Sequence, residues 1–528
     1  MADAADGAPW ALSAAERDAT VERIAANIST LAFFKGLELS DADARAAATA
    51  AERKAYTAAQ VAARTTTGSR PAAETTSAYA RKLGELVLAA VEECAAPGAD
   101  VGAANGDAAE SVDLFGTRDF LDAEATRAAL APLLAAGRAI RKVRFSTKSF
   151  GAEAAAVAAE ALRSVAHCLE HADMSDIIAG RPEDEALEAL RLVAGGLSAA
   201  KLRHLNLSDN ALGEKGVRAA AAALQHPGLE FLALQNVGAS VHACKAVEEL
   251  LPPGGALSGL HLFNNMSGDE GAGHIARLLA RCPRMADFKM ASSRVGAAGG
   301  IAIARALAAG GALVRLDLSD NPLTEEVAPA LAACLSAAPA LAHLNLNDTS
   351  LTDAGVATVC GALAGAAPRL ASLELALNEV TPDGAAHVVR AIAGKQHLAR
   401  LNLRENELED AGAAVLARGL ASLPALTALD LCANQLMRPG ALAVARAVAA
   451  ARRGAGSFEL LALDENAISE QGVEQLRALL KDAFGSDACL GPLDENDPDM
   501  AGDDDDDEAG AADGDDDGLA AALAKATI

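Results

Sequence analysis

The chemically capable side chains of this sequence do not form the patterns that make a catalytic pocket. There is no G-x-x-x-x-G-K-[ST] run to hold nucleotide phosphates, and neither a G-x-S-x-G elbow nor an H-E-x-x-H helix occurs. The 10 histidines show no metal-ligand spacing, and the 8 cysteines include no C-x-x-C pair, which indicates buried thiols in a reducing compartment. We therefore expect a binding protein and not an enzyme, with no cofactor, no metal and no nucleotide site.

Asparagines, in contrast, recur at a regular spacing. Asn210 ends the frame L-x-x-L-x-L-x-x-N that begins at Leu202. The same frame ends at Asn321, Asn378, Asn406 and Asn434, and looser copies end at Val237, Asn265, Ser293, Thr349 and Asn466. Counted from residue 210, successive ends are 27, 28, 28, 28, 28, 29, 28, 28 and 32 residues apart. An amide can both donate to and accept from turn backbone, so each of these asparagines is more simply explained as structural than as functional.

The frame also predicts the elements that must position any site. The two leucines of L-x-L point to one side of a short strand, and stacked strands would form a parallel sheet on a concave face. A period near 28 residues leaves room for one helix in each repeat. Helix N-caps are expected at Ser267, Thr352, Thr381 and Ser469. With two degenerate frames ending at Lys148 and Ile177, about 12 repeats are expected, and the predicted fold is an α/β leucine-rich-repeat horseshoe solenoid similar to ribonuclease inhibitor.

The flanking segments differ from the repeats in composition. Residues 1–96 have no repeat frame and predict a small all-α domain with helices over 14–32, 41–63 and 75–93, followed by an Ala- and Gly-rich linker over 97–115. The repeats would then fill 116–490, and 491–528 would be an acidic, disordered tail.

The net charge is -27, and 15 acidic residues without any Lys or Arg lie between Asp487 and Asp517. Such a chain should repel nucleic acid and anionic membranes and attract a basic partner. No secretory signal or membrane-spanning run is visible.

One asparagine departs from the repeat pattern. Asn236 stands one place before the frame end, which Val237 occupies. Because the side chain next to the stacking position should project from the rim of the sheet, a partner could contact it there. The alternative is an ordinary loop asparagine without a function.

Two groups of motifs carry a resemblance to a known family. The run from Asp176 to Glu188 and the run from Leu205 to Gly216 resemble the first repeats of plant Ran GTPase-activating proteins. Further similar stretches are 264–271, 292–296, 401–408 and 492–498, so that the resemblance covers about residues 8–528. Trp10, residues 22–30 and 79–82 resemble the plant WPP domain, which in the family anchors the protein at the nuclear envelope. Trp10 is followed by Ala11 and Leu12 and not by the family's two prolines, a departure within the targeting motif.

The resemblance implies a function and a set of site residues. Members of this family activate the small GTPase Ran in trans and support nucleocytoplasmic transport; an asparagine orients the GTPase's own glutamine. The matching position here is Asn236, and the family's important arginine corresponds to Arg181, whose alternative role is pairing with Glu183 or Asp184. The matched motifs further imply GTPase-binding roles for Asn210, Asn264, Asn265 and Arg294, and a targeting role for Trp10.

Partners and location follow from the same resemblance. The implied partners are a Ran-type GTPase in its GTP form, with a Ran-binding protein, and coiled-coil anchor proteins of the nuclear envelope; no nucleic acid and no direct membrane insertion are implied. The implied location is cytoplasmic with association to the nuclear envelope. Two other functions are compatible with a repeat protein: an inhibitor or sensor scaffold, and a purely structural adaptor. Ribonuclease inhibitors contain more Cys and Trp than this chain, which has a single Trp. The sequence leaves the anchors, the oligomeric state and the regulation open.

Overall fold

The computed structural model describes residues 110–135, 139–452, 458–491, 493 and 495–497, together with scattered positions between 17 and 83. The chain divides into two compact units, Met1–Ser111 and Val112–Ile528. In the first unit, the described positions within all three predicted helices are helical. Glu52 is buried there, accepts both guanidinium hydrogen bonds of Arg17 at 3.1 and 3.0 Å, and accepts the Tyr79 hydroxyl at 2.9 Å. Trp10 and the segments 97–109 and 498–528 lie outside the described residues.

The second unit is a solenoid whose strands form one 13-stranded sheet in the order β1-β3-β5-β6-β7-β8-β9-β10-β11-β12-β13-β14-β15. Neighbouring strands from β3 to β15 run parallel and in register. The strands are β1 (Glu110–Asp113), β3 (Ile140–Arg144), β5 (His171–Asp173), β6 (His204–Asn206), β7 (Phe231–Ala233), β8 (Gly259–Phe263), β9 (Asp287–Ala291), β10 (Arg315–Asp317), β11 (His343–Asn345), β12 (Ser372–Glu374), β13 (Arg400–Asn402), β14 (Ala428–Asp430) and β15 (Leu460–Ala462). A separate pair joins β2 (Asp119–Leu121) to β4 (Lys148–Phe150).

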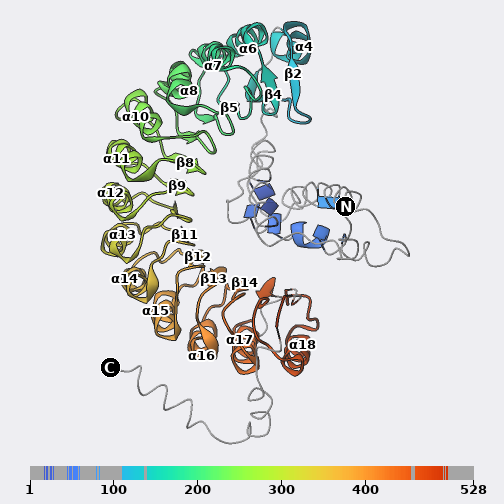
Figure 1. Cartoon of the computed structure of the whole chain (residues 1–528), viewed down its shortest axis with the longest axis vertical. Helices are drawn as coiled ribbons and strands as arrows, with labels where there is room; N and C mark the ends of the chain where they lie inside the picture. Colours follow the sequence, from blue (N-terminus) through green and yellow to red (C-terminus); the bar gives the residue numbers. More distant parts are fainter. Residues whose placement is uncertain are drawn as a thin grey trace, which may run out of the picture. The chain divides into compact units, whose positions relative to one another are not determined.

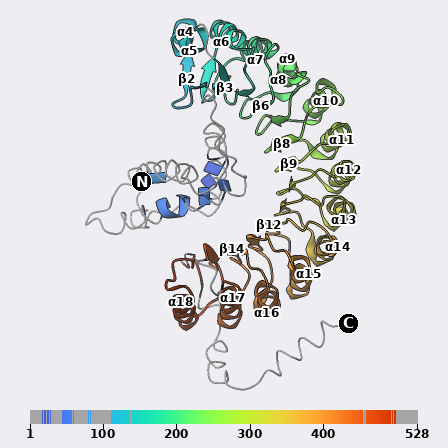
Figure 2. The ribbon, with the colours of Figure 1, turned by 180° about the vertical axis from the view of Figure 1, so that it is seen from behind.

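Helices cover the outer side of this sheet, and the repeat unit by itself is an arc with the strands on the inside (Figure 1; from behind in Figure 2). They are α4 (Ala123–Ala129), α5 (Ala131–Leu134), α6 (Ala152–Ser164), α7 (Glu183–Leu197), α8 (Gly213–Ala219), α9 (Ala221–Leu224), α10 (Val241–Leu250), α11 (Gly268–Leu279), α12 (Ala297–Ala308), η1 (Glu325–Val327), α13 (Ala328–Ser336), α14 (Thr352–Gly365), α15 (Pro382–Ile392), α16 (Glu409–Leu420), α17 (Arg438–Ala451) and α18 (Glu470–Phe484). Among the described residues, none of the helices combines the length and apolar character that a membrane crossing requires.

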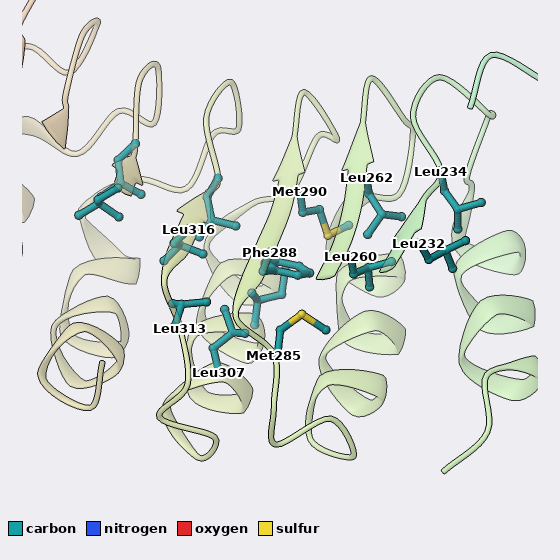
Figure 3. Close-up of a cluster of buried hydrophobic side chains, with 14 of the residues drawn as sticks. Leu232, Leu234, Leu260, Leu262, Met285, Phe288, Met290, Leu307, Leu313 and Leu316 are labelled. Carbon is teal, nitrogen blue, oxygen red and sulfur yellow. The ribbon is translucent and has the colours of Figure 1, made fainter. Parts of the chain in front are cut away.

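The core lies between the sheet and the helices. Leu232, Leu260, Phe288 and Leu316 occupy the same register position of four adjacent strands, and each is at most 1% exposed. Figure 3 shows them in one row across the strands, with the second inward side chains, such as Leu262 and Met290, in an adjacent row. Burying a side chain of this size contributes about 1.5–3 kcal/mol, and each repeat contributes several of them. A unit of this kind can bury its apolar face only against its neighbours, which explains the long uninterrupted stack.

A ladder of buried polar residues at the frame ends holds the turns together. Asn321 is representative: its Oδ1 accepts the backbone N–H groups of Ser293 and Val295 in the preceding repeat at 3.1 and 2.9 Å. Its Nδ2 donates to the backbone oxygen of Met290 at 2.8 Å and of Leu318 at 3.0 Å. The amide therefore satisfies backbone groups of two repeats at once, as the frame predicts.

The 12 expected repeats are confirmed, because each frame corresponds to one strand of the main sheet, namely β3 and β5 to β15. Both ends of the repeat unit extend further than predicted. β1 lies inside the predicted linker 97–115 and still pairs with the sheet. Asn496 lies in the predicted tail, yet its Oδ1 accepts the N–H of Ile468 at 3.0 Å and its Nδ2 donates to the oxygen of Ile468 at 2.8 Å. The boundaries at 115 and 490 are therefore wrong by a few residues, since neither edge segment keeps the leucines of the frame.

Two of the four predicted helix caps are confirmed. The hydroxyls of Thr381 and Ser469 accept backbone N–H groups at the starts of α15 and α18. Ser267 is fully buried and donates to the backbone oxygen of Ala239 at 2.9 Å, so it joins adjacent repeats and does not cap α11. Thr352 is already the first residue of α14 and bonds Glu325 at 3.0 Å. The hydroxyls of Ser267 and Thr352 therefore bond a neighbouring repeat and not the first turn of their own helix.

Candidate partner-binding rim

The residue just before each ladder position has a left-handed backbone, with φ between 47° and 68°. We call these positions the rim row: Thr147, Asp176, Asp209, Asn236, Asn264, Ser292, Asp320, Asp348, Leu377, Glu405, Ala433 and Glu465. Asn and Asp tolerate this conformation better than other residues with a Cβ, and they fill half of the row. The turn that lets the ladder side chain point inward thus places its predecessor at the edge of the sheet.

Asn236 occupies the rim row as the sequence predicts. Its side chain is exposed, whereas the neighbouring Val237 is 0% exposed in the ladder. Its Nδ2 donates to Oδ1 of Asp209 at 3.1 Å, and its Oδ1 accepts Nδ2 of Asn264 at 3.2 Å. Three successive members of the rim row are therefore joined in a line across three repeats. These two bonds use one N–H and one oxygen lone pair of the Asn236 amide, so its second N–H and its second lone pair can still bond a partner.

The carboxylate of Asp209 lies in an unfavourable electrostatic setting. Asp209 is an exposed residue, but neighbouring side chains partly desolvate its carboxylate, which raises its pKa, and the negative charge of Asp176 raises it further. The hydrogen bond from Asn236 and the positive charge of Arg118 act in the opposite direction. Arg118 pairs with Asp176 at 2.5 Å, so a cation from the segment before β2 neutralises the start of the row.

Arg181 lies in the loop between β5 and α7, where its guanidinium is held by several acceptors. Nε donates to Oγ of Ser149 at 3.0 Å, and Nη2 donates to the backbone oxygen of Ser149 at 2.8 Å. Glu185 pairs with it at 3.6 Å, and the ring of Phe120 lies 5.1 Å from the guanidinium carbon. The side chain is 17% exposed. Arg181 therefore links the loop before α7 to strand β4, and among the described residues its ion pair is with Glu185 and not with Glu183 or Asp184.

Two of the predicted binding residues do not belong to the exposed rim. Asn210 is 0% and Asn265 is 4% exposed, and both amides bond backbone groups of their own and the preceding repeat. Their prediction as contact residues is incompatible with this burial, because no polar group of either side chain is left for a partner. The family motif contains both ladder and rim positions, and the resemblance alone did not separate them.

The remaining predicted residues lie on the exposed side. Asn264 is exposed and bonded to Asn236, as described above. Arg294 is exposed and left-handed with φ 57°, in the loop that follows β9. Arg181 follows β5 and Asn236 follows β7, so they belong to repeats whose strands are two positions apart in the sheet. The structure thus joins Asn236 with Asn264 and leaves Arg181 and Arg294 on either side of them.

Sequence reasoning missed Asp209, Arg118 and Phe120. Asp209 carries a visible signal, since it stands at the same offset from its frame end as Asn236 does. Arg118 and Phe120 carry none: they approach Asp176 and Arg181 only because β2 pairs with β4 outside the main sheet. Phe120 is 61% exposed, so a large apolar side chain covers the arginine at the edge of the rim.

The fold and its repeats define a leucine-rich-repeat protein. Residues 198–219 and 394–417 match the family described as Leucine Rich repeat, and residues 312–334 match Leucine Rich Repeat. The chain is homologous to two curated proteins of Arabidopsis thaliana. It is 39% identical over 224 residues to RAN GTPase-activating protein 1, covering 40% of each chain, and 38% identical over 243 residues to RAN GTPase-activating protein 2, covering 43% of this chain and 44% of that one.

These similarities extend over part of the chain only. The chain spans about two fifths of the length of the curated relatives that it matches. Among solved structures, an internalin from Listeria monocytogenes has a TM-score of 0.38 at 14% identity, covering 64% of this chain and 78% of that chain.

Proposed function

We propose that this protein is a GTPase-activating protein for a Ran-type small GTPase and acts on the GTP-bound form in trans. The observation that carries the proposal is the homology to two proteins named RAN GTPase-activating proteins, at 39% and 38% identity. Asp209, Asn236 and Asn264 are exposed members of the rim row, and they supply a surface from which a side chain could reach into a partner's active site. A nucleotide site in this chain is not part of the proposal, since the GTPase supplies the nucleotide and the attacking water.

Asn236 is the proposed catalytic residue on this surface. GTPases hydrolyse slowly because the water and the glutamine that orients it are poorly positioned, and many activators add an arginine to stabilise the developing charge. Asn236 is exposed, and its amide has one N–H and one lone pair beyond its bonds to Asp209 and Asn264. These two groups match the amide of a glutamine side chain, which they could orient toward the attacking water.

Arg181 has a different proposed role. With bonds to both Oγ and the backbone oxygen of Ser149, its guanidinium would have to break several contacts before it could reach a partner. We therefore assign it to shaping the surface at the start of the rim, where Phe120 covers it. Asn264 and Arg294, both exposed, are the proposed contacts on the other side of Asn236.

The flanking segments have proposed roles that rest on the sequence. The WPP-like segment with Trp10 would bind coiled-coil anchor proteins, which would place a cytoplasmic protein at the nuclear envelope in support of nucleocytoplasmic transport. The acidic tail would attract a basic GTPase surface over a long range, an effect that weakens as salt is added. A Ran-binding protein is a further proposed partner of the complex.

A single-turnover hydrolysis assay on GTP-loaded Ran tests the proposal. The expected acceleration by the full chain is up to about 10⁵-fold, whereas the chain alone should release no phosphate from GTP. Saturable binding to Ran without any acceleration would instead establish the alternative, a leucine-rich-repeat scaffold or inhibitor. No acceleration at saturating concentrations contradicts the proposed function.

A further inference from the structure

We propose that Asp209 and Asn264 are positioning residues that fix which end of the Asn236 amide faces each side of the rim. The inference rests on the proposed function, because the orientation matters only if Asn236 acts on a partner. The supporting geometry is the line of two hydrogen bonds, from Asn264 to Asn236 at 3.2 Å and from Asn236 to Asp209 at 3.1 Å.

The direction of this line is set by the charge at one end. An ionised carboxylate only accepts hydrogen bonds, so the Nδ2 end of Asn236 must face Asp209. The Oδ1 end of Asn236 then faces the next repeat, where Asn264 can satisfy it only by turning its own Nδ2 toward it. Without the carboxylate, both amides could rotate by half a turn at little cost, because their N and O ends occupy nearly the same space. A partner would then encounter the Asn236 amide in a mixture of two orientations.

The backbone of the three residues is fixed independently of their side chains. Asp209, Asn236 and Asn264 are all left-handed, with φ of 58°, 52° and 52°. The backbone N–H groups of Asp209 and Asn236 donate to the oxygens of Gln235 and Phe263 at 2.8 and 2.7 Å. Only side-chain torsions remain to be set, and the hydrogen-bonded line sets them. Catalytic groups gain from such preorganisation because a misplaced group forfeits part of its contribution to the rate.

The other half of the rim row cannot form such a line. Asp320 and Asp348 are two acceptor-only groups in succession, and burial together with the charges of Asp320 and Glu405 raises the pKa of Asp348. An asparagine between a carboxylate and a second asparagine occurs in the rim row at Asn236 and nowhere else in it. Asp320 is therefore a matched control: it has the same backbone and the same residue type as Asp209, in a repeat outside the proposed site.

The test compares four proteins in single-turnover hydrolysis with GTP-loaded Ran: wild type, Asp209→Asn, the exchanged pair Asp209→Asn with Asn264→Asp, and Asp320→Asn. The exchanged pair keeps one carboxylate and two amides but reverses the line, so that Asn236 should present its amide the other way round. We expect the maximal rate to fall about two- to fivefold in Asp209→Asn, in which the Asn236 amide still samples the productive orientation, and about 10- to 100-fold in the exchanged pair, which holds the amide reversed. The half-saturating concentration and the melting temperature should change little in Asp209→Asn, the exchanged pair is compared by its maximal rate at saturation because Asn264 is itself a proposed contact, and Asp320→Asn should match wild type.

A second readout separates this inference from the proposed function. With selective ¹⁵N labelling of asparagine, the side-chain amide of Asn236 should exchange and rotate slowly in wild type and faster in Asp209→Asn. An amide that behaves alike in both proteins overturns the positioning role, whatever the hydrolysis assay gives. A full maximal rate in the exchanged pair overturns it as well. If the amide is ordered as expected but wild type does not accelerate hydrolysis, the positioning stands and the proposed function fails.

Discussion

The ladder and the rim row are neighbours in sequence and differ in almost every physical respect. Asn406 in the ladder is 5% exposed, and its amide bonds the backbone of two repeats. Asn236 in the rim row is exposed, and its amide bonds only the side chains of Asp209 and Asn264. The same residue type therefore stabilises the fold at one position and is available to a partner at the position before it. Residue type alone does not distinguish the two roles; register does.

The largest expected effect is that of a substitution in the rim row on the rate of GTP hydrolysis. Replacing Asn236 by Ala should lower the maximal rate of Ran-bound GTP hydrolysis by about 10²- to 10³-fold, as for removal of one preorganised donor. Binding should weaken less than the rate, since the contribution is made mainly in the transition state. The melting temperature should hardly change, because exposed substitutions usually stay within about 0.5 kcal/mol. A rate loss that merely follows a loss of folded protein would contradict a catalytic role.

The ladder should respond in the opposite way. Asn406→Ala leaves the buried N–H groups of Asn378 and Val380 without their acceptor, which should cost about 2–3 kcal/mol in the free energy of unfolding. The hydrolysis rate per folded molecule should be that of wild type. Urea unfolding followed by the hydrolysis assay on the folded fraction measures both quantities. If Asn406→Ala were stable and inactive, the register and the active rim would both be misassigned.

A pair of truncations tests where the ladder ends. Removing residues 499–528 should leave the melting temperature nearly unchanged, whereas removing 495–528 should lower stability by about 1–2 kcal/mol. The longer deletion removes Asn496, which bonds both backbone groups of Ile468, and Glu495, whose N–H bonds Asp464. Differential scanning calorimetry of the two proteins decides the matter. Equal melting temperatures would show that Asn496 contributes nothing to the last turn.

The smallest expected effect concerns the charge of Asp209. Its folded-state pKa is raised, chiefly by burial, so the folded protein binds the proton more tightly than the unfolded chain does. The associated stability is present below the unfolded pKa and is lost as the pH rises through the folded pKa. Compared with Asp209→Asn, wild type should therefore lose relative stability as the pH rises above about 4, by less than about 1 kcal/mol because the site is solvated. Parallel melting curves at several pH values measure this difference.

The sequence predicted the repeats well because each repeat contains its own evidence. The leucines of L-x-L must face the core, and a slip of one residue would expose them, so Leu205 and Leu401 identify their strands without knowledge of the rest. The exposed position of Asn236 followed from the same register. The buried positions of Asn210 and Asn265 also follow from it, whereas the family motifs that imply contacts at these residues contain ladder and rim positions alike.

Other parts of the site depend on contacts that no local pattern records. Arg118 reaches Asp176 from 58 positions earlier in the chain, through the separate β2–β4 pair. β1 has the sequence ESVD and joins the sheet as an edge strand without any leucine of the frame. Asp209 lies between these cases: its offset was visible, but its bond to Asn236 requires knowing that rim positions of adjacent repeats lie within hydrogen-bond distance.

The left-handed turn has a consequence for engineering the stability of this protein. Leu377 and Ala433 hold φ values of 55° and 51° although neither residue type favours that conformation, which costs each about 1 kcal/mol. Both lie on the half of the rim away from the proposed site. Asparagine at either position would fit the same backbone without the added chain entropy of glycine, so Leu377→Asn should raise the melting temperature by a few degrees while hydrolysis stays as in wild type. The fold thus contains unused thermal stability at rim positions that lie outside the proposed site.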